Sequence, residues 1–262
     1  MTPTIRNPFN APVYHEETVA STMDVSRQLA ERGELHGTVI FADFQEAGRG
    51  RIRERSWEMD KNVNLALTVL LRYPNVEDIP PALTLRAGLA VCFAVEDFLP
   101  SLRGEVKIKW PNDIMIGSKK AAGILCEAVG GNVHIGIGIN AAQKEFPDHL
   151  RGKAVSLSLA AGRDIAPDER FCLLEKVIDR LYRELETPQK SGWKDRLEQR
   201  LYKKDEQVSF AEGAADSGKV IRGRLAGVGS GGELLIVPEG ETEALPFVSG
   251  ELLFVYGGTA SL

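Results

Sequence analysis

The stretch from Val106 to Ile139 constrains the fold most, because apolar residues alternate along it and tight turns interrupt it. Alternation of this kind is typical of strands with one buried face. Turn-forming residues at 111–113, 117–118 and 130–132 reverse the chain between neighbouring segments. We therefore predict an antiparallel meander with strands at 106–110, 114–116, 121–129 and 133–139.

Helices and further strands surround this meander. Ser21 to Asp24 has the pattern of a capping box and opens a helix that runs to about Arg32. The segment 83–99 is apolar on most faces and ends before Pro100, which predicts a buried helix. We also predict strands at 38–44 and 64–71, a helix at 170–185, and an amphipathic helix through Trp193, Leu197 and Leu201.

After Tyr202 the composition changes to short segments rich in β-forming residues, separated by Gly, Ser and Glu. Evenly spaced short strands are typical of a small β-barrel. The fold class is thus α+β, with a mixed, largely antiparallel central sheet, helices, and a small C-terminal barrel. The domains are an extended arm at 1–12, a main domain at 13–202 and the barrel at 203–262.

Four arginines, Arg49, Arg51, Arg53 and Arg55, lie within seven residues on a loop with glycines at 48 and 50. Glycine lets the backbone approach a ligand closely, and guanidinium groups bind phosphate or carboxylate oxygens in pairs. Four like charges with few apolar neighbours cannot pack together, so we expect the loop to be mobile when empty and to order around an anion. The alternative is an exposed charged turn.

Composition limits the class of function. The chain has 262 residues, 43% of them hydrophobic, and a formal net charge of -5, which disfavours a general nucleic-acid binder. Cys92, Cys126 and Cys172 form no CxxC pair, which indicates reduced thiols in a cytoplasmic setting. The four histidines are isolated, so we expect neither a metal site nor a nucleophile triad. No apolar run reaches the ~18 residues of a membrane span, and no membrane partner is expected.

Three further motifs each have two interpretations. Lys109 to Asp113 is either a strand end with a turn or a site corner, where Trp110 stacks a planar ring and Asn112 and Asp113 bind polar groups or Mg²⁺. Lys119 and Lys120 are a solvated turn, unless one of them points inward. The alternating glycines at 136 and 138 leave room for a ligand against the sheet or mark a close helix crossing.

The motifs described above, taken together with their neighbouring residues and in their order along the chain, closely resemble those of the biotin protein ligases. The concurrence of five motifs at near-family spacing is more specific than any one of them. The family often has GRGR-x-GR-x-W, whereas this chain has GRGRIRERSW, with one residue more before Trp57 and no third glycine. The matching segments are Ser21–Thr22, Gln45–Arg51 (QEAGRGR), Lys109–Asp113 (KWPND), Lys120–Glu127 (KAAGILCE) and Gly136–Asn140 (GIGIN).

The resemblance implies a fold similar to class II synthetases, with a C-terminal SH3-like barrel, and a two-step activity. Biotin reacts with ATP to give biotinyl-5′-AMP and pyrophosphate, and biotin is then transferred to a lysine of a carboxylase's biotin carrier domain. It implies Mg²⁺, carried mainly by the ATP phosphates, with Asp113 as a candidate ligand. It allows a homodimer. Some members carry an N-terminal DNA-binding domain, but about 12 residues precede the main domain here, so we expect no DNA partner.

The resemblance also implies residue roles. Lys120, Arg51 and Arg49 would be catalytic and supply positive charge to the reacting anions. Arg49, Arg51, Trp57, Trp110, Asn112, Asn140 and Lys120 would bind ATP or the adenylate. Biotin would be held by Ser21, Thr22, Met23, Gln45, Gly48, Arg49, Gly50, Arg51, Lys120, Gly123, Gly136 and Gly138.

Two alternatives remain open at this point. A lipoate protein ligase has a similar fold and adenylate chemistry, but it needs a narrow apolar tunnel and does not usually combine GRGR with KWPND. A non-catalytic biotin or nucleotide sensor would bind the same ligands without consuming ATP.

Overall fold

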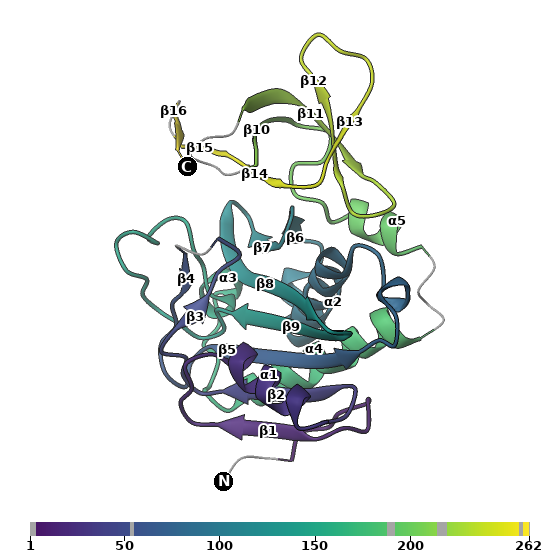
Figure 1. Ribbon diagram of the computed structural model, residues 1–262. Helices are drawn as coiled ribbons and strands as arrows, with labels where there is room; N and C mark the ends of the chain where they lie inside the picture. The colour runs from purple at the N-terminus through teal and green to yellow at the C-terminus, as the bar shows by residue number, and fades with distance from the viewer. Residues whose placement is uncertain (1–3, 53–54, 188–191, 214–218, 257–258, 262) are drawn as a thin grey trace.

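The structure, a computed structural model, describes residues 4–52, 55–187, 192–213, 219–256 and 259–261. A seven-stranded sheet in the order β1-β2-β5-β9-β8-β7-β6 forms its centre (Figure 1). β1 runs parallel to β2, and every other neighbouring pair is antiparallel, which confirms the mixed, largely antiparallel sheet. Its strands are β1 (Val13–Glu16), β2 (Thr38–Ala42), β5 (Leu65–Arg72), β6 (Val106–Lys109), β7 (Asp113–Ile116), β8 (Lys119–Val129) and β9 (Asn132–Ile139).

The predicted meander is β6 to β9, and its turns lie where glycines adopt positive φ. Gly117 has φ 58°, and Gly130 and Gly131 have φ 56° and 80°. Residues with a Cβ rarely adopt this region, so these glycines permit the tight reversals. β8 starts two residues earlier than predicted and β9 one residue earlier, because residues that were predicted as turns already pair with the neighbouring strand.

Helices cover both faces of the sheet. α1 (Thr22–Glu31) lies on one face against β2, β5 and β9, and the Ser21 hydroxyl caps it by accepting from the Met23 amide at 3.3 Å. α2 (Leu83–Phe98) packs on the other face against β6, β7 and β8, and α4 (Glu169–Glu186) lies beside it, where Phe171 contacts Phe41 of β2. The shorter helices are η1 (Val76–Asp78), η2 (Pro100–Leu102), α3 (Leu157–Ala161) and α5 (Trp193–Glu198).

The segment Val76–Phe98 is long and apolar enough to meet a simple criterion for a membrane-crossing helix. Its helical core, α2, is buried against the sheet and α4 and contributes many residues to the hydrophobic core. Burial within the protein explains its apolar character, since an internal helix is hydrophobic on all sides.

The C-terminal segment forms a five-stranded antiparallel sheet in the order β13-β12-β11-β10-β14, above the β6 end of the main sheet (Figure 1). This confirms the small β-domain. Trp110 joins the two parts, because its indole N–H donates to the Gly232 carbonyl at 2.9 Å and its ring packs on Phe210. The strands are β10 (Gln207–Glu212), β11 (Val220–Val228), β12 (Leu234–Pro238), β13 (Leu245–Phe247) and β14 (Gly250–Leu252); β15 (Phe254–Tyr256) and β16 (Thr259–Ser261) form a separate pair.

The arginine loop lies between β2 and β5 and begins as a short hairpin, β3 (Gly48–Arg49) with β4 (Ser56–Trp57). The Gly50 amide donates to the Arg55 carbonyl at 2.9 Å, which extends the pairing by one residue. A Cβ on Gly48 would lie 2.4 Å from the Trp57 carbonyl oxygen, so the close approach of the two strands requires glycine there. Arg53 and Glu54, which belong to the predicted loop, lie outside the described residues.

Candidate active site

One row of residues crosses five strands of the main sheet on a single face. Strand pairing places Ala66 beside Gly138, Gly138 beside Gly123, Gly123 beside Asp113, and Asp113 beside Lys109. Directly paired residues on neighbouring strands point to the same side of a sheet. The row therefore begins with three small residues and ends with two charged ones, and a different kind of cavity lies over each end.

The small end of the row is covered by two large side chains. A Cβ added to Gly138 would lie 2.4 Å from Trp57 Cε2, and one added to Gly136 would lie 2.8 Å from Met23 Sδ. The two glycines do share one face, as predicted. The space above them is not open, however, because Met23 from α1 and Trp57 from β4 occupy it. Gly136 thus lies under a helix, as one interpretation predicts, and Gly138 lies under Trp57, while a ligand against these glycines stays a prediction.

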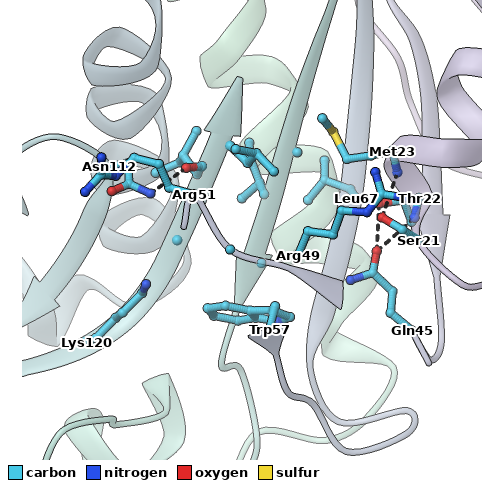
Figure 2. A pocket seen from close by; sticks show the side chains of 17 residues that line it. Ser21, Thr22, Met23, Gln45, Arg49, Arg51, Trp57, Leu67, Asn112 and Lys120 are labelled. Atoms are coloured by element: carbon cyan, nitrogen blue, oxygen red, sulfur yellow. Dashed lines mark hydrogen bonds between the residues drawn. The ribbon is translucent and has the colours of Figure 1, made fainter. Parts of the chain in front are cut away.

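A narrow cavity of about 60 Å³, here called the slot, lies among these side chains (Figure 2). It brings together every predicted biotin-binding residue except Gly48, which pairs with Trp57 in the β3–β4 hairpin. The apolar wall residues, Leu67, Ile124, Leu125 and Ile137, were not predicted, because no local sequence pattern distinguishes these strand residues from ordinary core residues. The slot is lined by Ser21, Thr22, Met23, Gln45, Arg49, Gly50, Arg51, Trp57, Leu67, Asn112, Lys120, Gly123, Ile124, Leu125, Gly136, Ile137 and Gly138.

One end of the slot carries neutral hydrogen-bonding groups. Gln45 Oε1 accepts from the Thr22 amide at 2.9 Å and from the Thr22 hydroxyl at 3.0 Å, and that hydroxyl accepts from Thr68 at 2.8 Å (Figure 2). Ser21 and Thr22 are each 2% exposed. A few fixed polar groups in an otherwise apolar cavity orient a ligand and select its polar pattern.

A wider cavity of about 510 Å³, here called the hollow, lies over the charged end of the row. Five lysines and arginines face three carboxylates across it. Gly50, Arg51, Trp57, Asn112 and Lys120 line both cavities, so the slot and the hollow adjoin at these residues, here called the shared opening. The other lining residues are Ile52, Arg55, Ser56, Glu58, Lys109, Trp110, Pro111, Asp113, His149, Leu150, Lys153 and Glu251.

The first two arginines of the loop diverge. Arg49 extends towards the α1 end of the slot (Figure 2), where it binds both carboxylate oxygens of Asp24 at 2.6 and 2.5 Å. Arg51 lines both cavities and donates to the Gly250 carbonyl of the C-terminal domain at 3.2 Å. The two side chains therefore serve different ends of the site.

Lys120 lies where the cavities meet, which confirms that one lysine of the Lys119–Lys120 pair points inward. Its ammonium is 2.6 Å from Asp113 Oδ1 and 5.8 Å from the Trp57 ring centroid. Asn112 is fixed beside it, because its side-chain amide donates to the Ile124 carbonyl at 2.9 Å. This places a cation, an aromatic face and an amide around one opening.

Lys109 forms part of the hollow's floor and is 2% exposed. Burial lowers the pKa of its ammonium to about 8, although the neighbouring carboxylates of Asp113 and Glu251 act in the opposite direction. A buried ammonium loses solvation, and nearby negative charge compensates only in part.

Two predicted nucleotide-binding residues have other contacts. Trp110 is 3% exposed and joins the two domains, so only an edge of it reaches the hollow. Asn140 is 4% exposed, lines neither cavity, and donates to the Val155 carbonyl at 3.3 Å. Both side chains therefore stabilise the fold around the site.

Asp113 lines the hollow, but Lys120 occupies one of its oxygens. Among the described residues, no group of three or more His, Cys, Asp or Glu side chains could hold a metal ion. A magnesium ligand role for Asp113 stays a prediction. The described cysteines are free, and burial raises the pKa of Cys92 to about 12, consistent with structural thiols.

Comparisons with known proteins agree with this geometry. The model of the biotin/lipoate A/B protein ligase family matches residues 16–142, which contain every residue that lines the slot. The chain is 40% identical over 164 residues to the bifunctional ligase/repressor BirA of Bacillus subtilis, covering 58% of this chain and 48% of that protein. The chain thus spans about half the length of the Bacillus relatives that it matches.

Two other similarities extend over most of both proteins. The biotin--[acetyl-CoA-carboxylase] ligase of Paracoccus denitrificans is 30% identical over 219 residues, covering 79% of this chain and 87% of that protein. The structure of the Aquifex aeolicus biotin protein ligase in complex with biotin and ATP superposes with a TM-score of 0.75 at 28% identity, covering 92% and 97% of the two chains. The likeness therefore includes the C-terminal domain as well as the site.

Proposed function

We propose, on the premise that this chain belongs to the biotin protein ligase family, that it activates biotin with ATP and transfers it to a lysine of an acceptor protein. The observation that carries the proposal is the shared opening between the slot and the hollow. Lys120, Arg51 and Trp57 line both. A carboxylate at the inner end of the hollow and a phosphate entering from its outer side would meet at these residues.

The slot suits the biotin ring system. Its ureido group has both donors and acceptors, and the Thr22–Gln45 pair offers both at one end of an apolar cavity. Met23 and Trp57 fill most of the space over the glycines, so a bicyclic ligand enters when the loop carrying Trp57 moves. Loop closure over the ligand then shields the reactive adenylate from water.

The hollow suits the nucleotide. In the first step a biotin carboxylate oxygen attacks the α-phosphorus of Mg·ATP, and the bond to the β-phosphate oxygen breaks, so that pyrophosphate leaves. Both reactants are anions, and their approach needs fixed positive charge. Lys120 and Arg51 supply it at the shared opening, whereas Arg49 lies at the α1 end of the slot, paired with Asp24. Trp57 offers its ring face to adenine.

In the second step an acceptor lysine, as the neutral amine, attacks the acyl carbon of biotinyl-5′-AMP. The carbon–oxygen bond to phosphate breaks, AMP leaves, and the amine nitrogen loses a proton. The name of the Paracoccus relative favours a biotin carrier domain of a carboxylase as the acceptor. A cytoplasmic location and a homodimer remain predictions.

The test is biotin-dependent release of pyrophosphate from Mg·ATP, run in parallel with lipoate and octanoate. We expect release with biotin alone, because the polar Thr22–Gln45 end has no counterpart in an aliphatic chain. Release with lipoate alone would assign the chain to the lipoate branch of the family. Tight biotin binding without ATP consumption would leave a sensor and refute the ligase.

A further inference from the structure

One part of the wall of the hollow comes from the segment 147–154, which carries no recognisable motif. The Lys120 amide donates to the Lys153 carbonyl at 2.8 Å, and the Val155 amide donates to the Lys120 carbonyl at 2.9 Å. His149 Nε2 lies 3.1 Å from Glu58 Oε1, so the same segment contacts the chain after β4. The backbone of Lys153 is thus fixed beside Lys120.

Most cations around the two cavities already have a partner. Arg49 binds Asp24, Arg55 binds Glu251 at 2.9 Å, Lys120 binds Asp113, and Arg51 donates to a carbonyl. Lys153 is exposed, and in the part of the chain that the structure describes no carboxylate or carbonyl engages its ammonium. An incoming anion therefore meets Lys153 without displacing an internal partner.

Lys153 contributes a large share of the net positive charge of the hollow. Five lysines and arginines and three carboxylates line the hollow, which leaves a surplus of two positive charges if all of them are ionised. Removing Lys153 would halve that surplus. The position also matters, since Lys120 lines both cavities, whereas Lys153, whose backbone lies beside it, lines the hollow alone.

We propose that Lys153 binds the β- and γ-phosphates of the nucleotide and the departing pyrophosphate. This inference rests on the proposed ligase function, in which the α-phosphate lies at Lys120 and Arg51. A lysine ammonium beside the outer phosphates forms charge-assisted hydrogen bonds that AMP cannot make. Lys153 therefore contributes to capture of Mg·ATP and to stabilisation of the leaving group.

The experiment compares the full-length wild type with Lys153→Ala, Lys153→Arg and Lys119→Ala. Lys119 is the matched control, because it is an exposed lysine close in sequence to Lys120 that lines neither cavity. Calorimetry measures binding of Mg·ATP, pyrophosphate, AMP and biotin to each protein. Biotin-dependent exchange of pyrophosphate with ATP gives KM and kcat.

For Lys153→Ala we expect binding of ATP and pyrophosphate to weaken about 10-fold, as the loss of one charge-assisted hydrogen bond implies. AMP and biotin binding should change less than about 2-fold. Lys153→Arg should keep most of the ATP affinity, and Lys119→Ala all of it. Equal weakening for AMP and ATP, or no change for either, would overturn the proposal.

The measurements distinguish a failure of the ligase function from a failure of the phosphate contact at Lys153. A wild type that binds ATP and pyrophosphate but releases no pyrophosphate with biotin would refute the ligase, while the binding comparison would still decide the phosphate contact. A wild type that binds neither ATP nor pyrophosphate would refute the role of Lys153 directly.

Discussion

The slot and the hollow lie over two ends of one row of the same sheet, yet they are built differently. The slot lies over adjacent strands and beside α1, and its floor is three glycines, Gly123, Gly136 and Gly138. The hollow has Lys109, Asp113 and Lys120 from the sheet and gathers its other charges from the arginine loop and the residue after its hairpin, the 147–154 segment and Glu251 of the C-terminal domain. Regular structure shapes the apolar cavity, and contacts between distant segments assemble the charged one.

The two cavities also differ in how their polar groups are satisfied. Neutral hydrogen bonds among Thr22, Gln45 and Thr68 fix one end of the slot. Ion pairs such as Lys120–Asp113 and Arg55–Glu251 fix the hollow. Changes in the slot should therefore act through shape and be insensitive to salt, whereas changes in the hollow should act through charge and weaken as salt rises.

The largest effect is expected at the residue that both cavities share. Lys120→Ala should lower the rate of adenylate formation by about 10²–10³-fold, because a fixed charge at the reacting groups is lost. Single-turnover formation of biotinyl-5′-AMP measures this directly. Lys119→Ala is the control for charge and folding, and an unchanged rate in Lys120→Ala would refute the role given to Lys120.

The floor of the slot should be the next most sensitive position. Gly138→Val places side-chain atoms where Trp57 now lies, since even a Cβ would be 2.4 Å from Trp57 Cε2. We expect biotin affinity to fall by more than about 10-fold as Trp57 is displaced, which is at least ~1.4 kcal/mol. Titration calorimetry gives the affinity, and tryptophan fluorescence reports the displacement.

Ile139→Val is a matched control one residue along the same strand, in the core and outside both cavities. It should cost about 0.5–1.5 kcal/mol of stability without changing biotin binding. Wild-type affinity in Gly138→Val would show that the glycine floor does not shape the slot.

The charged end of the row should make stability depend on pH. The pKa of Lys109 is lowered to about 8, chiefly by burial, from its usual value of 10.5. Between these values the unfolded chain holds a proton that the folded one has released, so stability rises with pH by up to about 1.4 kcal/mol per unit. Below the folded pKa both states are protonated, and this contribution becomes constant.

Denaturant unfolding of the wild type and Lys109→Met from pH 7 to 10 tests this sign. The difference in unfolding free energy, wild type minus variant, should increase between about pH 8 and 10. A flat or falling difference would mean that the Lys109 ammonium is not penalised by burial.

The smallest effect is expected at the contact between domains. Arg55 is about half exposed, and exposed ion pairs contribute only ~0.2–1 kcal/mol. Arg55→Glu breaks this pair and removes positive charge from the hollow, so it should raise the KM for Mg·ATP by a few-fold at low salt and hardly at all at high salt. The double variant Arg55→Glu with Glu251→Arg should restore part of the loss. If it restores none, the ion pair does not position the loop.

The sequence by itself determined the elements and the main chemical groups. Alternating apolar residues and turn glycines predicted β6 to β9, and the Ser21 cap predicted the start of α1. The β-rich composition after Tyr202 predicted the C-terminal domain. The motifs named Lys120, Arg51 and Trp57, which line both cavities. These features depend on residues close together in the chain, so local steric and hydrogen-bonding preferences suffice to reveal them.

Only the tertiary structure decided which side chains face one another. Strand register aligned Gly138, Gly123 and Asp113 in one row, and a shift of one residue would have turned each to the opposite face. Domain packing gave Trp110 its partner in Gly232, and packing of the 154–155 segment buried Asn140. Chain folding brought Lys153 and Glu251 to the hollow from segments without a motif. The physical reason is that charges and side chains from distant segments interact only after the backbone has brought them together.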